Sequence, residues 1–345
     1  MFLLKRLSQR RIWRQVALER LSEPLHLNLA SMFVAAFGSL RMKIFYDLCV
    51  RPQHAYGLLN AADAAIEGGH KRTTVIEFGV ADGAGLINIC ELGKRITKTT
   101  GVQFDVVGFD GGSGMPPYRD YRDHPEMYQP GWYRMQDPEA LRRALPANAS
   151  LHIGDIAETV AQYVAEHDRK SPIGFVSVDV DYYWSAAEAL RFLTGDPLHY
   201  LPRIAMYFDD VGHPWHNPWC GELLAINEFN ATNDYRKISR INFLRETRLF
   251  KNASWIRKMY FCHVFDHPER LERLRNYGQV DLGNPYLGLE RREGVQVRPP
   301  APLNRARRGH ISGEAPSCAT HGSAARSKTS CTRPLLPMPP LHRHE

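Results

Sequence analysis

The stretch TTVIEFGVADGAG, residues 73–85, decides the fold. Its first half is an apolar, β-branched run typical of a buried strand. Its second half alternates glycines and small residues before the helical pattern LINICELGKRIT at 86–97. A strand, a glycine-rich turn and a helix begin a β–α–β unit, and such crossover units join parallel strands. The stretch therefore predicts a parallel sheet.

The same unit recurs along the chain. Further strand-like runs separated by helical patterns lie at 102–110, 150–155, 172–181 and 203–210. Strands alternating with helices predict an α/β fold, a mostly parallel sheet with helices on both faces. Two later runs, at 235–241 and 254–266, are suited to close the sheet as an antiparallel pair.

The net charge is concentrated at the two ends of the chain. The formal charge is +7, and residues 291–345, with ten basic and three acidic side chains, account for all of it. The first twenty residues hold six basic side chains and one acidic. The body between these ends is acidic overall, which argues against a nucleic-acid partner.

Composition also sets the expected domain boundaries. We expect an N-terminal helical region at 1–70, a main domain at 71–275, a linker at 276–290 and a disordered Pro/Arg-rich tail at 291–345. The longest uncharged apolar stretch, at 26–40, is too short for a membrane span. The six cysteines form no C-x-x-C pair, which favours a reduced, cytoplasmic protein. The oligomeric state stays open, with a homo-oligomer among the alternatives.

Residues suited to a nucleotide-like cofactor follow the first three strands. The first strand ends in an alternating series that lets the backbone approach a ligand closely, comprising Glu77, Gly79, Ala81, Gly83 and Gly85. Asp110 ends the second strand, where a carboxylate suits ribose hydroxyls, and Asp155 ends the third, where it suits an adenine amino group. The competing interpretation of the series after the first strand is a glycine-rich turn without a ligand. For Asp110 and Asp155 it is a surface aspartate without a ligand.

Paired aspartates end the next two strands. SVDVDYYW at 177–184 contains Asp179 and Asp181, and IAMYFDDVG at 204–212 contains Asp209 and Asp210. Burying an ionised carboxylate is costly unless a cation or hydrogen-bond donors receive it. The competing interpretation is that these aspartates are strand-end caps and solvated loop residues.

These motifs resemble those of a known family. The series from Glu77 to Gly85 resembles the first motif of class I S-adenosylmethionine-dependent methyltransferases, with Ala81 where many members have glycine. Asp110 followed by GMP at 114–116 resembles the macrocin O-methyltransferase branch, which comprises metal-dependent sugar-methylating enzymes. Asp179-x-Asp181-Tyr182, then Asp209-Asp210, then AINEF at 225–229 are the most specific parts of this likeness, which covers roughly residues 73–265.

The resemblance implies a fold, a cofactor and a metal. The fold would be the seven-stranded, Rossmann-like methyltransferase sheet with strand order 3-2-1-4-5-7-6, in which the fourth and fifth strands are neighbours. S-adenosylmethionine would bind the residues that follow the first three strands. Mg²⁺, which prefers oxygen ligands, would be held by Asp179, Asp209 and Asp210, and Asp181 would be the general base.

The acceptor implied by the resemblance is a hydroxyl of a sugar or glycosylated metabolite. Candidate substrate residues near the aspartates are Tyr182, Tyr183, His213 and Trp215. Aromatic residues at a strand–helix turn also pack in the core, and loop histidines are often bystanders, so both interpretations remain. The aromatic, charged segment 117–136 is a candidate lid over the acceptor.

Two other classes of function compete with a methyltransferase. An NAD-dependent oxidoreductase would suit Asp110, but the fingerprint G-x-G-x-x-G is absent. A methyltransferase-like fold that serves as a non-catalytic binding partner or scaffold would not need all four aspartates. A nucleic-acid methyltransferase is a weaker alternative, since the body lacks a basic excess.

Overall fold

The computed structural model describes residues 17–270 and 285–287. The tail expected at 291–345 lies outside the described residues. The first sixteen residues also lie outside them. Of the expected linker at 276–290, only the short turn η6 (Pro285–Leu287) is described.

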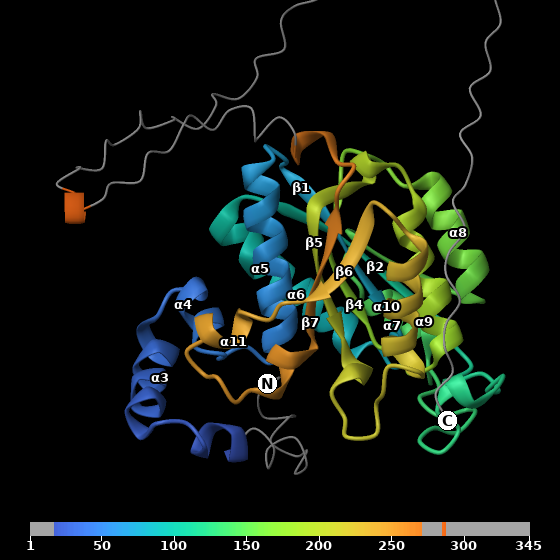
Figure 1. Cartoon of the computed structure of the whole chain (residues 1–345), viewed down its shortest axis with the longest axis horizontal. Helices are drawn as coiled ribbons and strands as arrows, with labels where there is room; N and C mark the ends of the chain where they lie inside the picture. The colour runs from blue at the N-terminus through green and yellow to red at the C-terminus, as the bar shows by residue number, and fades with distance from the viewer. Residues whose placement is uncertain (1–16, 271–284, 288–345) are drawn as a thin grey trace, which may run out of the picture. The chain divides into compact units, whose positions relative to one another are not determined.

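A seven-stranded sheet organises this part of the chain (Figure 1). The strands are β1 (Arg72–Phe78), β2 (Gln103–Asp110), β3 (Ala149–Ile153), β4 (Ile173–Val178), β5 (Tyr200–Phe208), β6 (Arg236–Arg240) and β7 (Met259–Val264). Their order is β3-β2-β1-β4-β5-β7-β6, with β1 to β5 parallel and β7 antiparallel to both β5 and β6. The predicted α/β class and the Rossmann-like methyltransferase strand order are confirmed.

Helices cover both faces of the sheet. On one face lie α5 (Pro52–Glu67) and α6 (Ala84–Thr100), and on the other lie α8 (Ile156–Glu166), α9 (Tyr183–Leu190) and α10 (Gly221–Thr232). Successive side chains of a strand point to opposite faces, so Val75 joins the apolar cluster under α5 and α6 while Ile76 joins the opposite one. All six residues of β4 are buried, as expected for a central strand covered on both sides.

Shorter elements complete the described chain. They are the helices α3 (Leu25–Phe37), α4 (Leu40–Phe45), α7 (Pro138–Ala144) and α11 (Leu244–Thr247), and the 3-10 turns η1 (Tyr121–Asp123), η2 (Arg191–Thr194), η3 (Pro197–His199), η4 (Asp209–Val211) and η5 (Ser254–Lys258). The N-terminal helices expected before the first strand are therefore present from α3 onward, and α5 packs directly on β4 and β5. None of the described helices has the length and apolar character needed to cross a membrane.

Two long loops meet beyond the carboxyl ends of the central strands. The segment between β2 and α7 contains η1, and the loop between η4 and α10 carries the histidines and tryptophans noted in the sequence. They contact each other where the Cys220 thiol donates to the carbonyl oxygen of Tyr121, 3.5 Å away. Both loops lie at the lower edge of the molecule in Figure 1, and they flank the candidate site.

Candidate active site

The glycine loop after β1 is locked against β4. Gly79 has φ +82°, and a Cβ placed there would lie 1.7 Å from the carbonyl oxygen of Asp179. Its N–H donates to the carbonyl of Phe109 at 2.9 Å, and the Asp179 N–H donates to the carbonyl of Phe78 at 3.0 Å. Only glycine fits this position, because a side chain would separate the first motif from the strand that carries Asp179.

The rest of the loop turns into α6 through two further left-handed residues. Ala81 has φ +46°, and Gly83, the N-cap of α6, has φ +83°. Gly85 lies against the buried carboxyl of Glu77, where a Cβ would come 2.0 Å from Oε1. The small residues of the predicted motif are thus required by the backbone path and by the close packing of Glu77.

Glu77 is a buried acid with an unused oxygen. Its side chain is 4 % exposed, Oε2 has no hydrogen-bond partner, and burial raises the pKa of the carboxyl to about 8. An unpartnered buried carboxyl oxygen beside a glycine loop is what a cofactor with a cationic or hydrogen-bond-donating group would satisfy. Glu77 therefore fits the cofactor role predicted for it.

Asp110 orients the glycine loop. Its Oδ2 accepts hydrogen bonds from the N–H groups of Val80 (2.9 Å) and Ala81 (2.8 Å), and its Oδ1 accepts one from Gly112 N–H (2.6 Å). A carboxylate offers about four lone-pair sites, so capacity for a ribose hydroxyl remains. Asp155 differs, because it is exposed and its Oδ1 caps α8 by accepting from Ala157 N–H at 2.8 Å.

Three of the four predicted aspartates converge. Carboxylate oxygens of Asp179, Asp181 and Asp210 lie within 4.8 Å of one another, a spacing that suits a shared cation. Neighbouring strands explain the meeting, because Asp179 follows β4 directly and Asp210 lies in η4 directly after β5. Asp181 reaches the group through a left-handed backbone, φ +58°, which is uncommon outside glycine, although aspartate adopts it more readily than most residues.

Asp209 is paired with groups outside the converging set. Its Oδ1 accepts hydrogen bonds from the Lys258 ammonium at 2.9 Å and from the Tyr207 hydroxyl. Burial opposes its ionisation, but Lys258, the Tyr207 hydroxyl and Arg51 together hold its pKa below the ordinary value. The structure thus puts Asp181, not Asp209, in the converging group, which differs from the ligand set that the resemblance implied.

Burial and mutual repulsion perturb the converging carboxyls. Burial, reinforced by the neighbouring aspartates, raises the pKa of Asp181 to about 8 and that of Asp210 to about 6. The pKa of Asp179 rises well above its ordinary value for the same reasons. Oδ2 of Asp210 is buried and has no hydrogen-bond partner. A cation among these oxygens would remove both the repulsion and the unpartnered atom, so the donor set fits a hard divalent metal.

Glu222 is a candidate supporting residue that the sequence pattern did not indicate. It is fully buried in the first turn of α10, and its Oε2 accepts a hydrogen bond from the Asp210 N–H at 2.9 Å. Its Oε1 accepts a longer one from the Val180 N–H at 3.4 Å. One carboxyl therefore ties together the two loops that carry the aspartates. In the sequence it resembles an ordinary acid at a helix N-terminus, a position where acids are common.

Tyr128 brings the candidate lid into the site. Its hydroxyl donates to Oδ1 of Asp210 at 3.0 Å and lies 3.2 Å from Nε2 of His216. Burial, with His124 next, lowers the pKa of His216 to about 4, so this imidazole is neutral near pH 7. The segment 117–136 thus covers the aspartates at this point, which supports the lid prediction.

The predicted substrate residues divide into buried and exposed pairs. Tyr182 is 1 % exposed and packs with Met115 and Tyr128, and Tyr183 is 5 % exposed and donates its hydroxyl to Glu228 at 2.5 Å. The rings of Tyr182 and Tyr183 therefore follow the packing interpretation. His213 and Trp215 are exposed on the loop that follows the aspartates.

Comparisons with solved structures find methyltransferases. CalS11, a calicheamicin methyltransferase, matches with 21 % identity over 61 % of this chain and 79 % of its own, at a TM-score of 0.42. A structure of CmcI with Mg and SAM matches with 18 % identity over 59 % and 70 % of the two chains, at a TM-score of 0.32. An O-methyltransferase from Bacillus cereus in complex with SAH matches with 14 % identity over 61 % and 80 %, at a TM-score of 0.34.

The chain matches no protein-family model and no curated protein. The solved structures carry names from the class that the sequence motifs resemble. Their identities to this chain lie below 25 % and their TM-scores below 0.5.

Proposed function

We propose that this protein is an S-adenosylmethionine-dependent O-methyltransferase that uses a divalent cation, with Mg²⁺ the expected ion. The observation that carries the proposal is the convergence of Asp179, Asp181 and Asp210 directly beside the glycine loop. The close approach of Gly79 to the backbone of Asp179 joins the glycine loop to the aspartate group, so a cofactor on the loop and an acceptor at the aspartates would be adjacent.

The residues present suit a metal-assisted transfer. Asp179 and Asp210 would hold the cation, since Mg²⁺ is usually bound through one or two carboxylates and keeps several waters. When bound, the cation would lower the pKa of an acceptor hydroxyl and offset the charge of the carboxylates. Asp209 would contribute through its ion pair with Lys258, which fixes the start of η4.

Asp181 is the proposed general base. Its carboxylate lies in the converging group, so it can accept the proton of an acceptor hydroxyl bound there as the oxygen attacks the methyl group of the sulfonium. The C–O bond forms as the S–CH₃ bond breaks, and S-adenosylhomocysteine leaves with its sulfur neutral. The residues of the site mainly position and stabilise the reacting groups.

The proposed acceptor is a hydroxyl of a sugar or glycosylated metabolite. Exposed aromatic side chains on the two loops around the site support it, because sugar rings stack on such side chains. Those exposed on the loop after the aspartates are Trp215 and Trp219, and those on the segment 117–136 are Tyr118, Tyr121, Trp132 and Tyr133.

The test is transfer of a labelled methyl group from S-adenosylmethionine to a panel of nucleotide sugars and glycosides. We expect transfer that depends on Mg²⁺ and is lost in Asp181→Asn, with S-adenosylhomocysteine binding retained. Transfer that Asp181→Asn leaves unchanged would remove the base assignment. Binding of S-adenosylhomocysteine without transfer to any acceptor would favour the scaffold alternative.

A further inference from the structure

The helix α5 runs antiparallel to β4, so its N-terminus lies at the edge of the sheet that carries the aspartates. In the second half of α5, the Cβ of Ala61 lies 2.9 Å from where a Cβ on Gly174 would be. Near the start of the helix, Nε2 of His54 lies 3.5 Å from Oγ of Ser177. Contacts thus move forward along β4 as the helix is followed back to its start. The residue one turn before His54 therefore lies at the level where β4 ends, next to the glycine loop.

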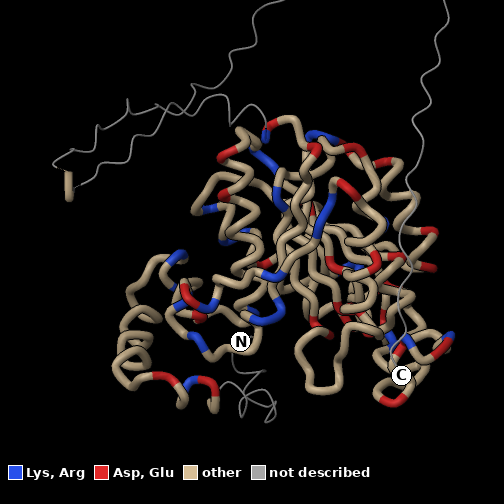
Figure 2. The backbone as a smooth tube through the Cα atoms, viewed as in Figure 1, with Lys and Arg blue, Asp and Glu red and all other residues tan. Residues whose placement is uncertain are grey.

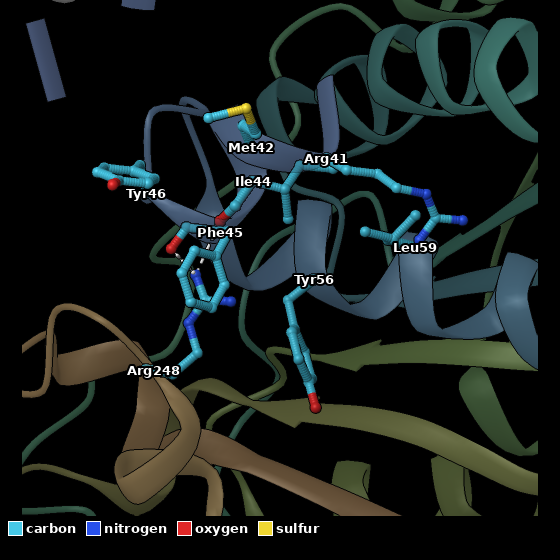
Figure 3. A pocket seen from close by; sticks show the side chains of 8 residues that line it. All are labelled: Arg41, Met42, Ile44, Phe45, Tyr46, Tyr56, Leu59 and Arg248. Atoms are coloured by element: carbon cyan, nitrogen blue, oxygen red, sulfur yellow. Dashed lines mark hydrogen bonds between the residues drawn. The ribbon is translucent and has the colours of Figure 1, made fainter. Parts of the chain in front are cut away.

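Arg51 occupies that position and has donors to spare. It is the N-cap residue of α5, and its Nε is buried without a hydrogen-bond partner. Within the described part of the chain, its guanidinium forms no ion pair. Two other arginines close to α5, drawn in Figure 3, are committed, because Arg41 pairs with Asp63 and Arg248 pairs with Asp47 and donates to backbone carbonyls of α4. Arg51 is therefore available to a ligand.

Arg51 lies between two acids of the candidate site. Burial raises the pKa of Glu77 to about 8, and the positive charge of Arg51 is the largest influence that opposes this rise. Burial also opposes the ionisation of Asp209, and Arg51 acts with Lys258 to lower the pKa of that carboxyl. Glu77 belongs to β1 and Asp209 follows β5, the two strands that flank β4. Figure 2 shows acidic positions at this lower edge of the sheet.

The buried polar atoms without partners here form a set with both charges. Oε2 of Glu77 is one, and Oδ1 of Asn88 is another, on the same face of α6 as Gly85, which packs against Glu77. Nε of Arg51 is the third. Buried polar groups are normally paired, so this set indicates a ligand. An ammonium group would satisfy the two oxygens. A carboxylate would satisfy Arg51 and is favoured at the N-terminus of a helix. A ligand that carries both groups on one carbon is an α-amino acid.

We propose that Arg51 binds the carboxylate of the amino-acid end of S-adenosylmethionine, and that Glu77 and Asn88 receive the ammonium group of the same end. This inference rests on the proposed function, because it assigns residues to one part of that cofactor. The amino-acid end is joined to the sulfonium, so residues that hold it beside the aspartates also keep the methyl group near the acceptor.

A simple counter-charge for the surrounding acids is the competing role of Arg51. That role involves no contact with the cofactor carboxylate. Removing Arg51 would then change the affinity for every cofactor analogue by the same factor, whether or not the analogue carries a carboxylate. The two roles therefore differ in a measurable way.

Calorimetric titration of the full chain with S-adenosylhomocysteine and with its decarboxylated analogue separates these roles. We expect the wild type to bind S-adenosylhomocysteine about ten- to a hundred-fold more tightly, as hydrogen bonds to a charged group imply. Arg51→Met keeps the length of the side chain and should lose this preference, while binding the analogue at least as tightly as the wild type does. Arg51→Lys keeps the charge without the planar pair of donors and should fall between them. The control Arg169→Met removes a surface arginine paired with Asp196 and should bind both ligands like the wild type.

Three results would overturn the role of Arg51. They are equal affinities of the wild type for the two ligands, an Arg51→Met protein that keeps the preference, and an Arg51→Met protein that weakens both ligands by one factor at an unchanged melting temperature. Failure of the wild type to bind either ligand would instead contradict the proposed cofactor, and this inference with it. If Arg51→Met does not fold, the wild type and Arg51→Lys decide between the same outcomes.

Discussion

Replacing Gly79 by alanine should open the contact between the cofactor loop and the aspartate strand. The new Cβ would meet the carbonyl oxygen of Asp179 at 1.7 Å, whereas real Cβ contacts essentially never fall below 3.0 Å. The backbone of one strand end must therefore move by about 1.3 Å. Gly101 is the matched control, because it has nearly the same φ, +80°, and a Cβ there would touch nothing within 4 Å.

Both substitutions lose stability because alanine must adopt a left-handed backbone, but only Gly79→Ala also creates a steric clash. A left-handed alanine costs about 1–2 kcal/mol in either place. At Gly79, overpacking adds about 1–3 kcal/mol. Loss of the hydrogen bond from Asp179 N–H to Phe78 adds about 1 kcal/mol. We expect Gly79→Ala to destabilise by about 3–6 kcal/mol and Gly101→Ala by about 1–2 kcal/mol, by adding these contributions.

Thermal unfolding and ligand binding measure the difference. At about 2–4 °C per kcal/mol for a domain of this size, Gly79→Ala should melt about 6–24 °C lower than the wild type, and Gly101→Ala only about 2–8 °C lower. Gly79→Ala should also lose affinity for S-adenosylhomocysteine, which Gly101→Ala should keep. Equal melting temperatures and equal affinities for the two variants would refute the proposed coupling of loop and strand.

Three further predictions concern the aspartate group. Asp210→Asn removes one repelling carboxylate, so it should raise the melting temperature of the metal-free protein while weakening Mn²⁺ binding, measured by calorimetry, at least about ten-fold; tighter Mn²⁺ binding would contradict this. Asp181 keeps a proton in the folded state up to a pKa of about 8, against an ordinary value of 3.8. Metal-free stability should therefore fall as pH rises from about 4 to about 8, and the melting-temperature gain from Mg²⁺ should grow over that window; a gain independent of pH would count against the site. Glu222→Gln keeps the shape of the side chain but replaces one carboxylate oxygen that accepts from the N–H groups of Asp210 and Val180. Mn²⁺ affinity should therefore drop about three- to ten-fold, as expected for a supporting residue. The control Glu91→Gln changes an exposed residue and should leave the affinity unchanged.

Much of the fold could be predicted because its determinants are local. The buried runs at β1, β4 and β5 and the helical patterns between them identify each element to within a few residues, and the strand order followed from the motif resemblance. The exposure of α3 could not be predicted, because an apolar helix is as typical of a core as of a docking surface.

The aspartates could be predicted as a set but not in their individual directions. Side chains alternate between the two faces of the sheet only as far as the strands extend. Asp209 and Asp210 lie in a 3-10 turn and Asp181 has a left-handed backbone, so this alternation cannot be used to say where each carboxylate points. Lys258, which pairs with Asp209, comes from a distant part of the chain. Glu222 acts on backbone N–H groups across a loop, a contact that leaves no local pattern.

Calorimetric titration of S-adenosylhomocysteine into the full chain, with and without Mg²⁺ and with NAD in parallel, tests the central claim most directly. The product needs no acceptor in order to bind. We predict micromolar binding of S-adenosylhomocysteine under both conditions and no heat from NAD. Binding of NAD with S-adenosylhomocysteine silent would favour the oxidoreductase, and silence of both ligands would contradict an enzyme built on this cofactor.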